Sequence, residues 1–379
     1  MIIGIPRETK EYESRVPLIP ESAKKLTGLA GVTLYIEKGL GLSVGYTDAE
    51  YEKAGAQIKS SAKEILKESD IVVRLNRPAK NEIGLLKKGA LHISYLDPFF
   101  EKETLESFLK RDVSAVSMEM IPRTTLAQKM DAMSSQANLA GYVAVVLAAE
   151  RLNKVFPMMM TPAGTISPSR VFIIGAGVAG LQAIATAKRL GARVEAFDTR
   201  PVVEEQVQSL GAKFIKIDLG ETGQTKDGYA KELTSEQLKK QQDLMVKHIH
   251  MADVVITTAQ VFGRKAPRII TAEMLKGMRP GSVVVDLAVE TGGNVEGSKP
   301  GEELLVDGVN IIGLRNLPGR VAIHASQMYS ANVVNFLTHF WDAKANQFDF
   351  EKDDEIIHGA RIIKEGKLVN EQLKKHWEL

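Results

Sequence analysis

The chain has 379 residues, of which 44% are hydrophobic and 25% charged, a composition typical of a globular chain of about two domains. Its formal net charge is only +2, and its lysines and arginines are scattered, so charge gives no argument for nucleic-acid binding. The lack of cysteine excludes disulfides and thiolate chemistry and fits a reducing compartment. We see no apolar leader core and no run of about 20 apolar residues, so we expect a soluble chain that is not exported.

Residues 1–137 alternate short apolar runs with amphipathic stretches, which predicts strands alternating with helices in a parallel sheet covered on both faces. The expected strands are IIGIP, VTLYIE, IVVRL and ALHISYL. The expected helices are ESAKKLTGL, DAEYEKAGA, SAKEILKES and EKETLESFLKR. A long, mostly apolar helix of the kind that packs between domains is predicted from Asn138 to Asn153. The following segment, PMMMTPAGTISPSR, is predicted to be a loop.

A second alternating series begins at RVFIIGAGVAGLQAIATAKRLGARVEAFDTR and continues through AKFIKI, ADVVITTA, GSVVVDLA and VNIIGL, the pattern of a six-stranded doubly wound sheet. The polar insert between AKFIKI and ADVVITTA is too long for an ordinary connection, which predicts a mobile loop at about residues 220–235 followed by a helix. The tail from Ala322 is predicted to be helical and to pack on the first domain. We therefore predict an α/β protein with two Rossmann-like doubly wound domains, a discontinuous one at 1–137 and 321–379 and a second at 138–320.

The strongest chemical signal is the pattern Gly175-Ala-Gly177-Val-Ala-Gly180, which follows the apolar strand VFIIG and opens the helix LQAIATAKRL. In a dinucleotide-binding turn the first glycine makes the turn, the second lets a pyrophosphate approach, and the third lets helix and strand pack closely. After the next strand, VEAF, Asp198 can accept hydrogen bonds from adenosine ribose hydroxyls and repels a 2′-phosphate. The pattern favours NAD over NADP, although Arg200 weakens that distinction. A glycine-rich turn with an unused aspartate is the alternative.

Other polar residues have a structural interpretation beside a functional one. Asp286 ends the apolar strand of GSVVVDLAVETGGNVE and Glu290 follows it, at the sheet edge where open α/β sheets bind ligands. Capping of the following turn explains them nearly as well. We interpret His324 as an ordinary helical histidine, and His248 and His250 lack a third metal ligand.

Four segments carry a family resemblance: IGIPRETKEYESRVPLIP, FIIGAGVAGLQAIATAKRLGA, VVVDLAVETGGN and NLPGR. Together they resemble the superfamily of alanine dehydrogenases and nicotinamide nucleotide transhydrogenases, over nearly the whole chain. The resemblance implies two competing functions, amino-acid oxidation and transhydrogenation. The departures from each pattern distinguish them.

The departures weigh against alanine oxidation. Alanine dehydrogenases hold the substrate carboxylate with an arginine and a lysine, and use a histidine as acid/base with an aspartate nearby. The resemblance places Arg15 at the arginine, but LNRP puts Asn76 at the lysine position. The histidine position holds Asp97 and the aspartate position holds Glu290. An asparagine does not replace a cation, and Asp97 would repel the substrate carboxylate.

The stretch RTTLAQKMD resembles the cofactor loop of the NAD(H)-binding component of transhydrogenases, which carries an arginine, a glutamine five residues on and an aspartate three later. The segment DGYAKEL resembles that component's mobile loop, which closes over bound nucleotide. The resemblance implies a catalytic set of Gln128, Arg123 and Asp131. The cofactor-binding residues that we predict for NAD(H) are Arg123, Gln128, Asp131, Ser134, Gly175, Gly177, Val178, Gly180, Asp198, Thr199, Arg200, Gly228, Tyr229, Ala259 and Gln260.

The implied activity is direct hydride transfer between NADH on this chain and NADP⁺ on a partner component, coupled to proton translocation by membrane subunits. Such a transfer needs two nicotinamide rings held close together and no general acid or base. The resemblance also implies a homodimer, and the lack of a spanning segment implies a subunit peripheral to the cytoplasmic face of the inner membrane. An NAD-dependent amino-acid dehydrogenase and a non-catalytic NAD-binding module are the alternatives. No metal site is expected.

Overall fold

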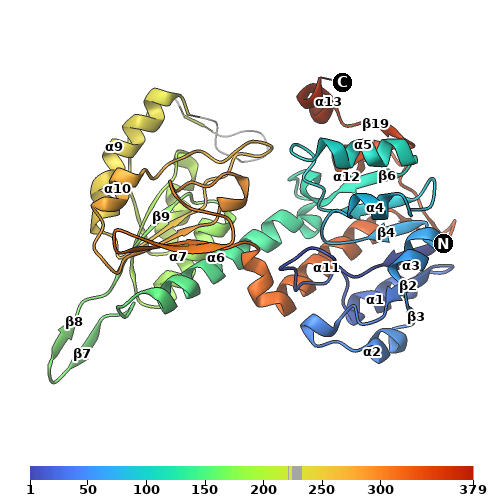
Figure 1. Ribbon diagram of the computed structural model, residues 1–379, viewed down its shortest axis with the longest axis horizontal. Helices are drawn as coiled ribbons and strands as arrows, with labels where there is room; N and C mark the ends of the chain where they lie inside the picture. Colours follow the sequence, from blue (N-terminus) through green and yellow to red (C-terminus); the bar gives the residue numbers. More distant parts are fainter. Residues whose placement is uncertain (221, 224–232, 379) are drawn as a thin grey trace. The chain divides into compact units, whose positions relative to one another are not determined.

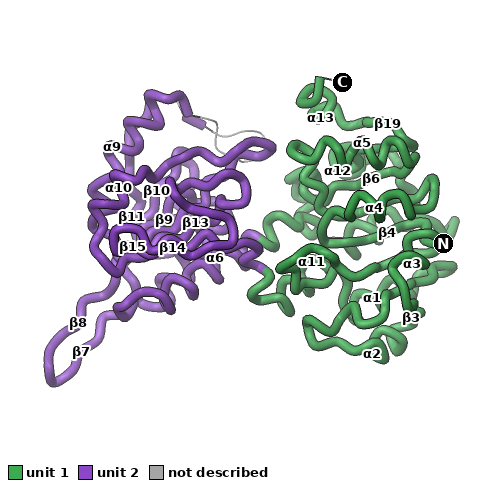
Figure 2. The backbone as a smooth tube through the Cα atoms, viewed as in Figure 1, with its two compact units in different colours: residues 1–136, 319–379 green, residues 137–318 purple. Residues whose placement is uncertain are grey.

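The computed structural model describes residues 1–220, 222–223 and 233–378, and the chain folds into two compact units (Figure 1, Figure 2). Unit 1 comprises Met1–Gln136 and Gly319–Leu379, and unit 2 comprises Ala137–Pro318. Each unit has its own parallel sheet and its own apolar core. The site residues of each unit are therefore positioned by a separate framework.

The sheet of unit 1 runs in the order β3-β2-β1-β4-β5-β6 with all neighbours parallel, and it continues through the antiparallel strands β18 and β19. This 3-2-1-4-5-6 order is that of a doubly wound Rossmann sheet. The central strands β4 and β5 are buried at every position, as expected when helices cover both faces. The strands are β1 (Ile2–Ile5), β2 (Thr33–Glu37), β3 (Gln57–Lys59), β4 (Ile71–Val73), β5 (Leu91–Ser94), β6 (Ser114–Ser117), β18 (Arg361–Lys364) and β19 (Lys367–Leu368).

The C-terminal part of the chain completes the core of unit 1. From α11, Tyr329, Val333 and Phe336 join the same buried cluster as Ile3 and Ile5 of β1. The helices of this unit are α1 (Pro20–Thr27), α2 (Asp48–Lys53), α3 (Ala62–Glu68), α4 (Lys80–Ile83), α5 (Lys102–Arg111), α11 (Ala322–His339), α12 (Glu355–Ala360) and α13 (Glu371–Trp377). The two ends of the sequence thus build one hydrophobic core.

Unit 2 has the second doubly wound sheet, in the order β11-β10-β9-β12-β13-β15 with all neighbours parallel and β14 antiparallel at the edge. Its strands are β9 (Arg170–Ile174), β10 (Arg193–Phe197), β11 (Lys213–Phe214), β12 (Val254–Thr257), β13 (Val283–Asp286), β14 (Glu302–Val306) and β15 (Val309–Gly313). Its helices are α7 (Val178–Arg189), α8 (Glu204–Ser209), α9 (Ser235–Met251) and α10 (Ala272–Lys276). The predicted α/β class with two Rossmann-like sheets is confirmed.

Local sequence explains where several helices begin. Ser61, Asp354 and Asn370 each accept a hydrogen bond from a backbone N–H of the first turn that follows, at the starts of α3, α12 and α13. Thr234 and Gln237 form a reciprocal capping box at the start of α9. These side chains satisfy N–H groups that a helix cannot pair internally.

The long apolar helix α6 (Ala132–Arg151) begins six residues before its predicted start. The reason is Asp131, whose Oδ1 accepts from Ser134 N at 2.8 Å and so caps the helix. Among the described residues, α6 has the length and apolar composition to cross a membrane, although 44% of its most apolar window is buried. A Cβ on Gly141 would lie 2.1 Å from Ala179 O, so this part of α6 is closely packed on α7.

Short strands occur in two segments for which the sequence predicted none, the loop after α6 and the helical tail. The predicted loop after α6 contains a two-stranded hairpin, β7 (Met159–Thr161) and β8 (Gly164–Ile166), which projects from the sheet of unit 2 (Figure 1). The predicted helical tail contains β18 and β19 as well as helices, because β18 pairs with β6. A second small hairpin in the tail joins β16 (Trp341–Asp342) and β17 (Gln347–Phe348).

Candidate functional site

The chain turns tightly after β9, in the glycine segment of unit 2. Gly175 has a φ of +96°, in the left-handed region that favours glycine. A Cβ on Gly180 would lie 1.9 Å from the Gly175 carbonyl oxygen, so glycine is needed for α7 to pack on the end of β9. A Cβ on Gly177 would meet no atom nearer than Arg200 Nη2, 4.0 Å away. Two glycines are therefore fixed by packing, whereas Gly177 leaves open space at the turn.

The N-terminus of α7 lies beside that open space. Gly177 precedes the helix without any side-chain cap, so the N–H groups of the first turn, beginning at Val178, are available to a ligand. A helix N-terminus also carries partial positive charge, which stabilises an anion. The turn fits a pyrophosphate: it offers donors, a favourable dipole and no Cβ in the way.

Asp198 follows the last residue of β10 and is tied to the same turn. Its Oδ2 accepts from Ala176 N at 2.7 Å and from Arg200 Nη2 at 2.8 Å. Its Oδ1 accepts from Arg200 N at 2.8 Å and from Arg200 Nε at 2.9 Å. The hydrogen bonds that Arg200 donates to Asp198 outweigh burial and raise the pKa of Arg200, so Arg200 keeps its positive charge. The structure therefore brings Asp198 to the glycine turn and joins it to Arg200 by an ion pair that the sequence did not predict.

A second loop at this sheet edge follows β12 and contains Ala259 and Gln260. Thr258 Oγ1 donates to the Gly175 carbonyl at 3.0 Å, which joins the loop to the glycine turn. Asn294 holds Ala259 from both sides, accepting from its N–H at 3.1 Å and donating to its carbonyl at 2.8 Å. Gln260 Nε2 donates to the Leu287 carbonyl at 3.3 Å. The loop with the two predicted residues is thus joined to the glycine turn, and Asn294 positions Ala259.

The sequence allowed two roles for Asp286, ligand binding and capping of the following turn. The structure shows the second, structural role. It is fully buried at the end of β13, and its carboxylate accepts from the backbone N–H groups of Ala288, Asn294 and Val295 at 3.0–3.2 Å. A buried carboxylate with this many donors is satisfied by the fold. Glu290 instead accepts from Asn316 N at 3.2 Å, in the same unit.

In unit 1, the segment from Arg123 to Ser134 forms a compact polar loop. Arg123 Nε lies 3.9 Å from Asp131 Oδ2, and that same oxygen accepts from Ser134 Oγ at 2.6 Å. Gln128 begins a single 3-10 turn and is exposed. Three of the predicted residues are therefore joined by one carboxylate, and the fourth presents its amide to solvent.

Packing on α11 fixes the backbone of this loop. Met130 is buried in the core of unit 1, and the Lys129 carbonyl accepts from Asn332 Nδ2 at 2.9 Å and Asn335 Nδ2 at 3.1 Å. Asn332 Oδ1 in turn accepts from Ser135 Oγ at 2.8 Å. The turn that carries Gln128 is thus held from a helix some two hundred residues further along the chain, and no local pattern could have identified Asn332.

Unit 1 also contains a buried polar cluster around Arg15. Its Nε and Nη2 donate to Glu13 at 2.8 and 2.7 Å, and its Nη1 donates to Gln136 Oε1 at 2.8 Å. Burial opposes the charge of Glu13, but the bonds and charge of Arg15 outweigh it and lower the Glu13 pKa. Arg15, 8% exposed, is therefore a buried ion-pair partner and not a surface arginine.

The chain has no positive charge at the two positions where the family resemblance places a lysine and a histidine. Asn76 Nδ2 donates to Glu8 at 3.1 Å and to Glu13 at 2.9 Å. Asp97 is exposed and its N–H donates to Glu119. Burial, against the opposing charge of Arg74, raises the pKa of Glu8. The cluster is rich in carboxylates, and the Asn76 amide already donates to two of them.

The remaining sequence predictions have separate outcomes. Thr199 presents its carbonyl to Thr222 Oγ1 at 2.7 Å. Gly228 and Tyr229 lie outside the described residues. His324 is an exposed residue of α11. Among residues 1–220, 222–223 and 233–378, no cluster of three or more acidic or histidine side chains could hold a metal ion.

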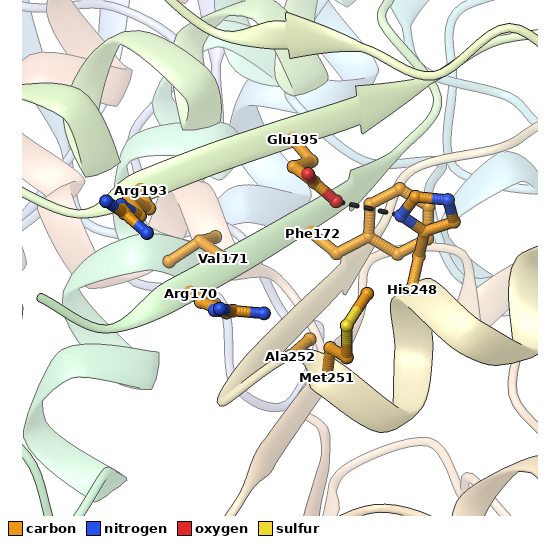
Figure 3. Close-up of a pocket in the computed structure, with 8 residues that line it drawn as sticks. All are labelled: Arg170, Val171, Phe172, Arg193, Glu195, His248, Met251 and Ala252. Carbon is orange, nitrogen blue, oxygen red and sulfur yellow. Dashed lines mark hydrogen bonds and ion pairs between the residues drawn. The ribbon is translucent and has the colours of Figure 1, made fainter.

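A small hollow of about 150 Å³ lies at the opposite edge of the unit 2 sheet (Figure 3). Arg170 and Arg193, the first residues of β9 and β10, stand on its rim. His248 of α9 lines the other side, and its Nδ1 lies 2.8 Å from Glu195 Oε2. This interaction joins α9 to β10, which explains His248 structurally. Since the glycine turn and Asp198 follow the last residues of the same strands, the hollow is separate from the glycine turn.

Comparison with known proteins gives the same result for both halves of the chain. Residues 4–140 match the alanine dehydrogenase/PNT N-terminal domain, and residues 144–371 match the alanine dehydrogenase/PNT C-terminal domain. An NAD(P) transhydrogenase alpha subunit from Rhodospirillum rubrum is 44% identical over 98% of this chain and 99% of that protein.

Two solved structures are similar over nearly their whole lengths. The transhydrogenase from Sinorhizobium meliloti has a TM-score of 0.84 and 42% identity, covering 98% of this chain and 100% of that one. An L-alanine dehydrogenase has a TM-score of 0.83 but only 26% identity, covering 100% and 99%. The fold is therefore common to both kinds of protein, and the sequence is more similar to the transhydrogenases.

Proposed function

Because the chain belongs to the alanine dehydrogenase/PNT family, and is more similar in sequence to transhydrogenases than to alanine dehydrogenases, we propose that it is the NAD(H)-binding subunit of a proton-translocating transhydrogenase. In this role it passes hydride between its own NADH and NADP⁺ held by a partner component. Membership of the family implies binding of a nicotinamide nucleotide. The NADP(H)-binding partner and the membrane subunits belong to the proposal.

The observation that carries this choice over alanine oxidation is the character of the Arg15 cluster. An amino-acid substrate brings a carboxylate, which needs a free cation. Here Arg15 is already bonded to Glu13, and Asn76 is neutral where the family resemblance places a lysine. A further carboxylate would face the like charge of Glu13, beside the carboxyl group of Glu8.

The nucleotide-binding role follows from unit 2. The turn at Gly177 and the N-terminus of α7 would hold the pyrophosphate. Asp198 would accept from the adenosine ribose, and the loop at Ala259 and Gln260 would line the same edge of the sheet. The acid at Asp198 favours NAD(H) over a 2′-phosphorylated nucleotide.

The polar loop of unit 1 would act at the nicotinamide end. Asp131, oriented by Ser134 Oγ and close to Arg123, would position the carboxamide or the ribose. The exposed Gln128 would reach toward the partner's nucleotide. A hydride moves between carbon atoms, so no proton leaves or enters, and one nicotinamide is oxidised as the other is reduced. The protein's contribution is to bring the two rings to about 3–3.5 Å and to exclude water.

A homodimer is also part of the proposal. The hairpin β7–β8 and the residue before it expose large apolar side chains, with Met158 61%, Met160 79% and Ile166 46% exposed. Such a projecting apolar surface is expected to be covered by another chain. The subunit would be peripheral, attached on the cytoplasmic face of the inner membrane to the proton-translocating subunits.

The proposal is tested by reconstitution with an NADP(H)-binding component of the family, following the reduction of an NAD analogue by NADPH. We expect transfer only when both components are present. Gln128→Asn is expected to keep NADH affinity but slow transfer by about tenfold or more, because a displacement of about 1 Å can lower a rate by up to about a hundredfold. Gln57→Asn, the same shortening at an exposed position of β3, is the control. Unchanged transfer in Gln128→Asn would remove the proposed role of that side chain.

A further inference from the structure

We infer that Arg200 occupies the place of the adenosine ribose on Asp198 and must leave it when the nucleotide binds, so that Arg200 competes with the ligand. The inference rests on the proposed nucleotide site of unit 2. It assigns to Arg200 the opposite of the direct binding role that its position in the sequence predicted.

Hydrogen-bond capacity carries the first step. An ionised carboxylate offers about four lone-pair positions. Asp198 uses four, for Ala176 N, Arg200 N, Arg200 Nε and Arg200 Nη2. The two ribose hydroxyls need two acceptor positions, so two of the present donors must be displaced.

The identity of the displaced donors follows from the covalent structure. Ala176 N and Arg200 N are main-chain groups, and the turn after β9 and the chain after β10 fix their positions. The guanidinium of Arg200 is at the end of a side chain with several rotatable bonds. Its Nε and Nη2 bind the two oxygens of Asp198 in a fork, in the same way that the two hydroxyls of a diol would. The guanidinium is therefore the group that leaves.

The position of the guanidinium supports this step. Its Nη2 lies 4.0 Å from where a Cβ of Gly177 would be, and it is the nearest atom to that point. The guanidinium therefore lies at the open side of the glycine turn, where the dinucleotide must pass. The Arg200 side chain is only 12% exposed, so it is held in this place.

The pair also affects selection of the nucleotide. While Arg200 is bound, the charges of Asp198 and Arg200 cancel, and the repulsion of a 2′-phosphate by Asp198 is weakened. Without Arg200 the same carboxylate would repel a 2′-phosphate fully. Arg200 therefore reduces both the affinity for the ribose diol and the discrimination against NADP(H).

The test uses the whole chain and measures displacement of fluorescent NADH by adenosine, which has the diol but no phosphate. Because adenosine has no phosphate, removing a positive charge from the protein does not weaken adenosine binding through lost attraction. Arg200→Ala is compared with Arg193→Ala, which removes the same charge from the far end of β10, and with Arg200→Lys, which keeps the charge but not the fork. The probe 2′,3′-dideoxyadenosine lacks both hydroxyls.

We expect Arg200→Ala to bind adenosine about tenfold more tightly than the wild type, the equivalent of one hydrogen bond to a charged group. Arg200→Lys should be intermediate, and Arg193→Ala should match the wild type. Dideoxyadenosine should bind all four proteins equally, and the ratio of NADPH to NADH dissociation constants should rise in Arg200→Ala. Adenosine binding that weakens or stays the same in Arg200→Ala would overturn the inference while leaving the proposed function intact. A wild type that binds no NADH would overturn both.

Discussion

The buried histidine of unit 1 should make this unit sensitive to mild acid. His92 of β5 is fully buried, and its Nε2 lies 2.9 Å from Ser94 Oγ. Because that hydroxyl donates to the Tyr95 carbonyl, it accepts from His92, which leaves the proton on Nε2. Among the described residues, Nδ1 has no hydrogen-bond partner. A second proton would therefore be buried without an acceptor, beside the positive charge of Arg74.

The magnitude follows from the pKa. Burial, with a smaller contribution from Arg74, lowers the pKa of His92 to about 3. In the unfolded chain an ordinary histidine has a pKa of about 6.5. Between these values only the unfolded chain takes up the proton, so stability is complete above about pH 6.5 and falls by about 1.4 kcal/mol per pH unit below it. At about pH 5 the loss is about 2 kcal/mol.

The assay can observe unit 1 alone, because both tryptophans of the chain, Trp341 and Trp377, belong to it. Urea unfolding followed by tryptophan fluorescence at about pH 7.5 and about pH 5 gives the free energy of unfolding at each pH. His92→Gln keeps a donor for Ser94 and does not titrate. The fall in stability between the two pH values should be about 2 kcal/mol smaller in this variant than in the wild type. His324→Gln, at an exposed position of the same unit, is the matched control.

The test compares the loss of stability on acidification in the wild type and in His92→Gln, so the contributions of other titrating groups cancel. Burial raises the pKa values of Glu8 and Glu119, so these acids favour the folded state as the pH falls and oppose the effect of His92. They are present in both proteins. If wild type and His92→Gln lose stability equally on acidification, His92 is not the buried neutral group described, and the reasoning fails.

Two further predictions concern unit 2. Gly180→Ala should weaken NADH binding and destabilise the unit by about 1–3 kcal/mol, the usual effect of overpacking, because its Cβ would lie 1.9 Å from Gly175 O. Gly177→Ala, with open space around its Cβ, should weaken NADH binding without a loss of stability. Calorimetry measures the binding and urea unfolding measures the stability. Equal stability of the two variants would contradict the packing argument. Asp198→Ala should weaken NADH binding in a fluorescence titration. Oxidation of L-alanine with NAD⁺ at enzymatic rates, by the wild type or this variant, would refute the choice of transhydrogenation.

The alternation of strands and helices was sufficient to predict both doubly wound sheets, because buried parallel strands are short continuous apolar runs. The alternation did not predict the segments whose structure depends on pairing with another strand. The segment at Arg361–Lys364 is a strand because β6 offers it an edge. The strands of the β7–β8 hairpin have only three residues each, too few to show an alternating pattern. The start of α6 was misplaced because the capping role of Asp131 was not recognised.

The residues proposed for the site could be identified from the sequence, but the residues that hold them in place could not. The glycine turn is a local pattern, and the Arg123–Asp131 loop was identified by its family resemblance. Asn294 and Asn332, which hold the loops at Ala259 and Lys129, bond across 35 and 203 residues. An isolated asparagine gives no signal of such a partner. The occupation of Asp198 by Arg200 was similarly hidden, since two residues close in sequence show nothing of their geometry until the turn is built.

The similarity to an L-alanine dehydrogenase structure, with a TM-score of 0.83, shows how little the shared fold decides here. In the function that we propose, charge at a few positions in unit 1 distinguishes this chain from an alanine dehydrogenase. The carboxylates of Glu8 and Glu13 lie around Asn76, which can donate hydrogen bonds but contributes no charge. Arg74 is bonded to Glu82, and Arg15 to Glu13, so each guanidinium already has its carboxylate. A lysine in place of Asn76 would supply the missing cation for a substrate carboxylate. The asparagine at this position supports the proposed hydride transfer, which needs no such cation.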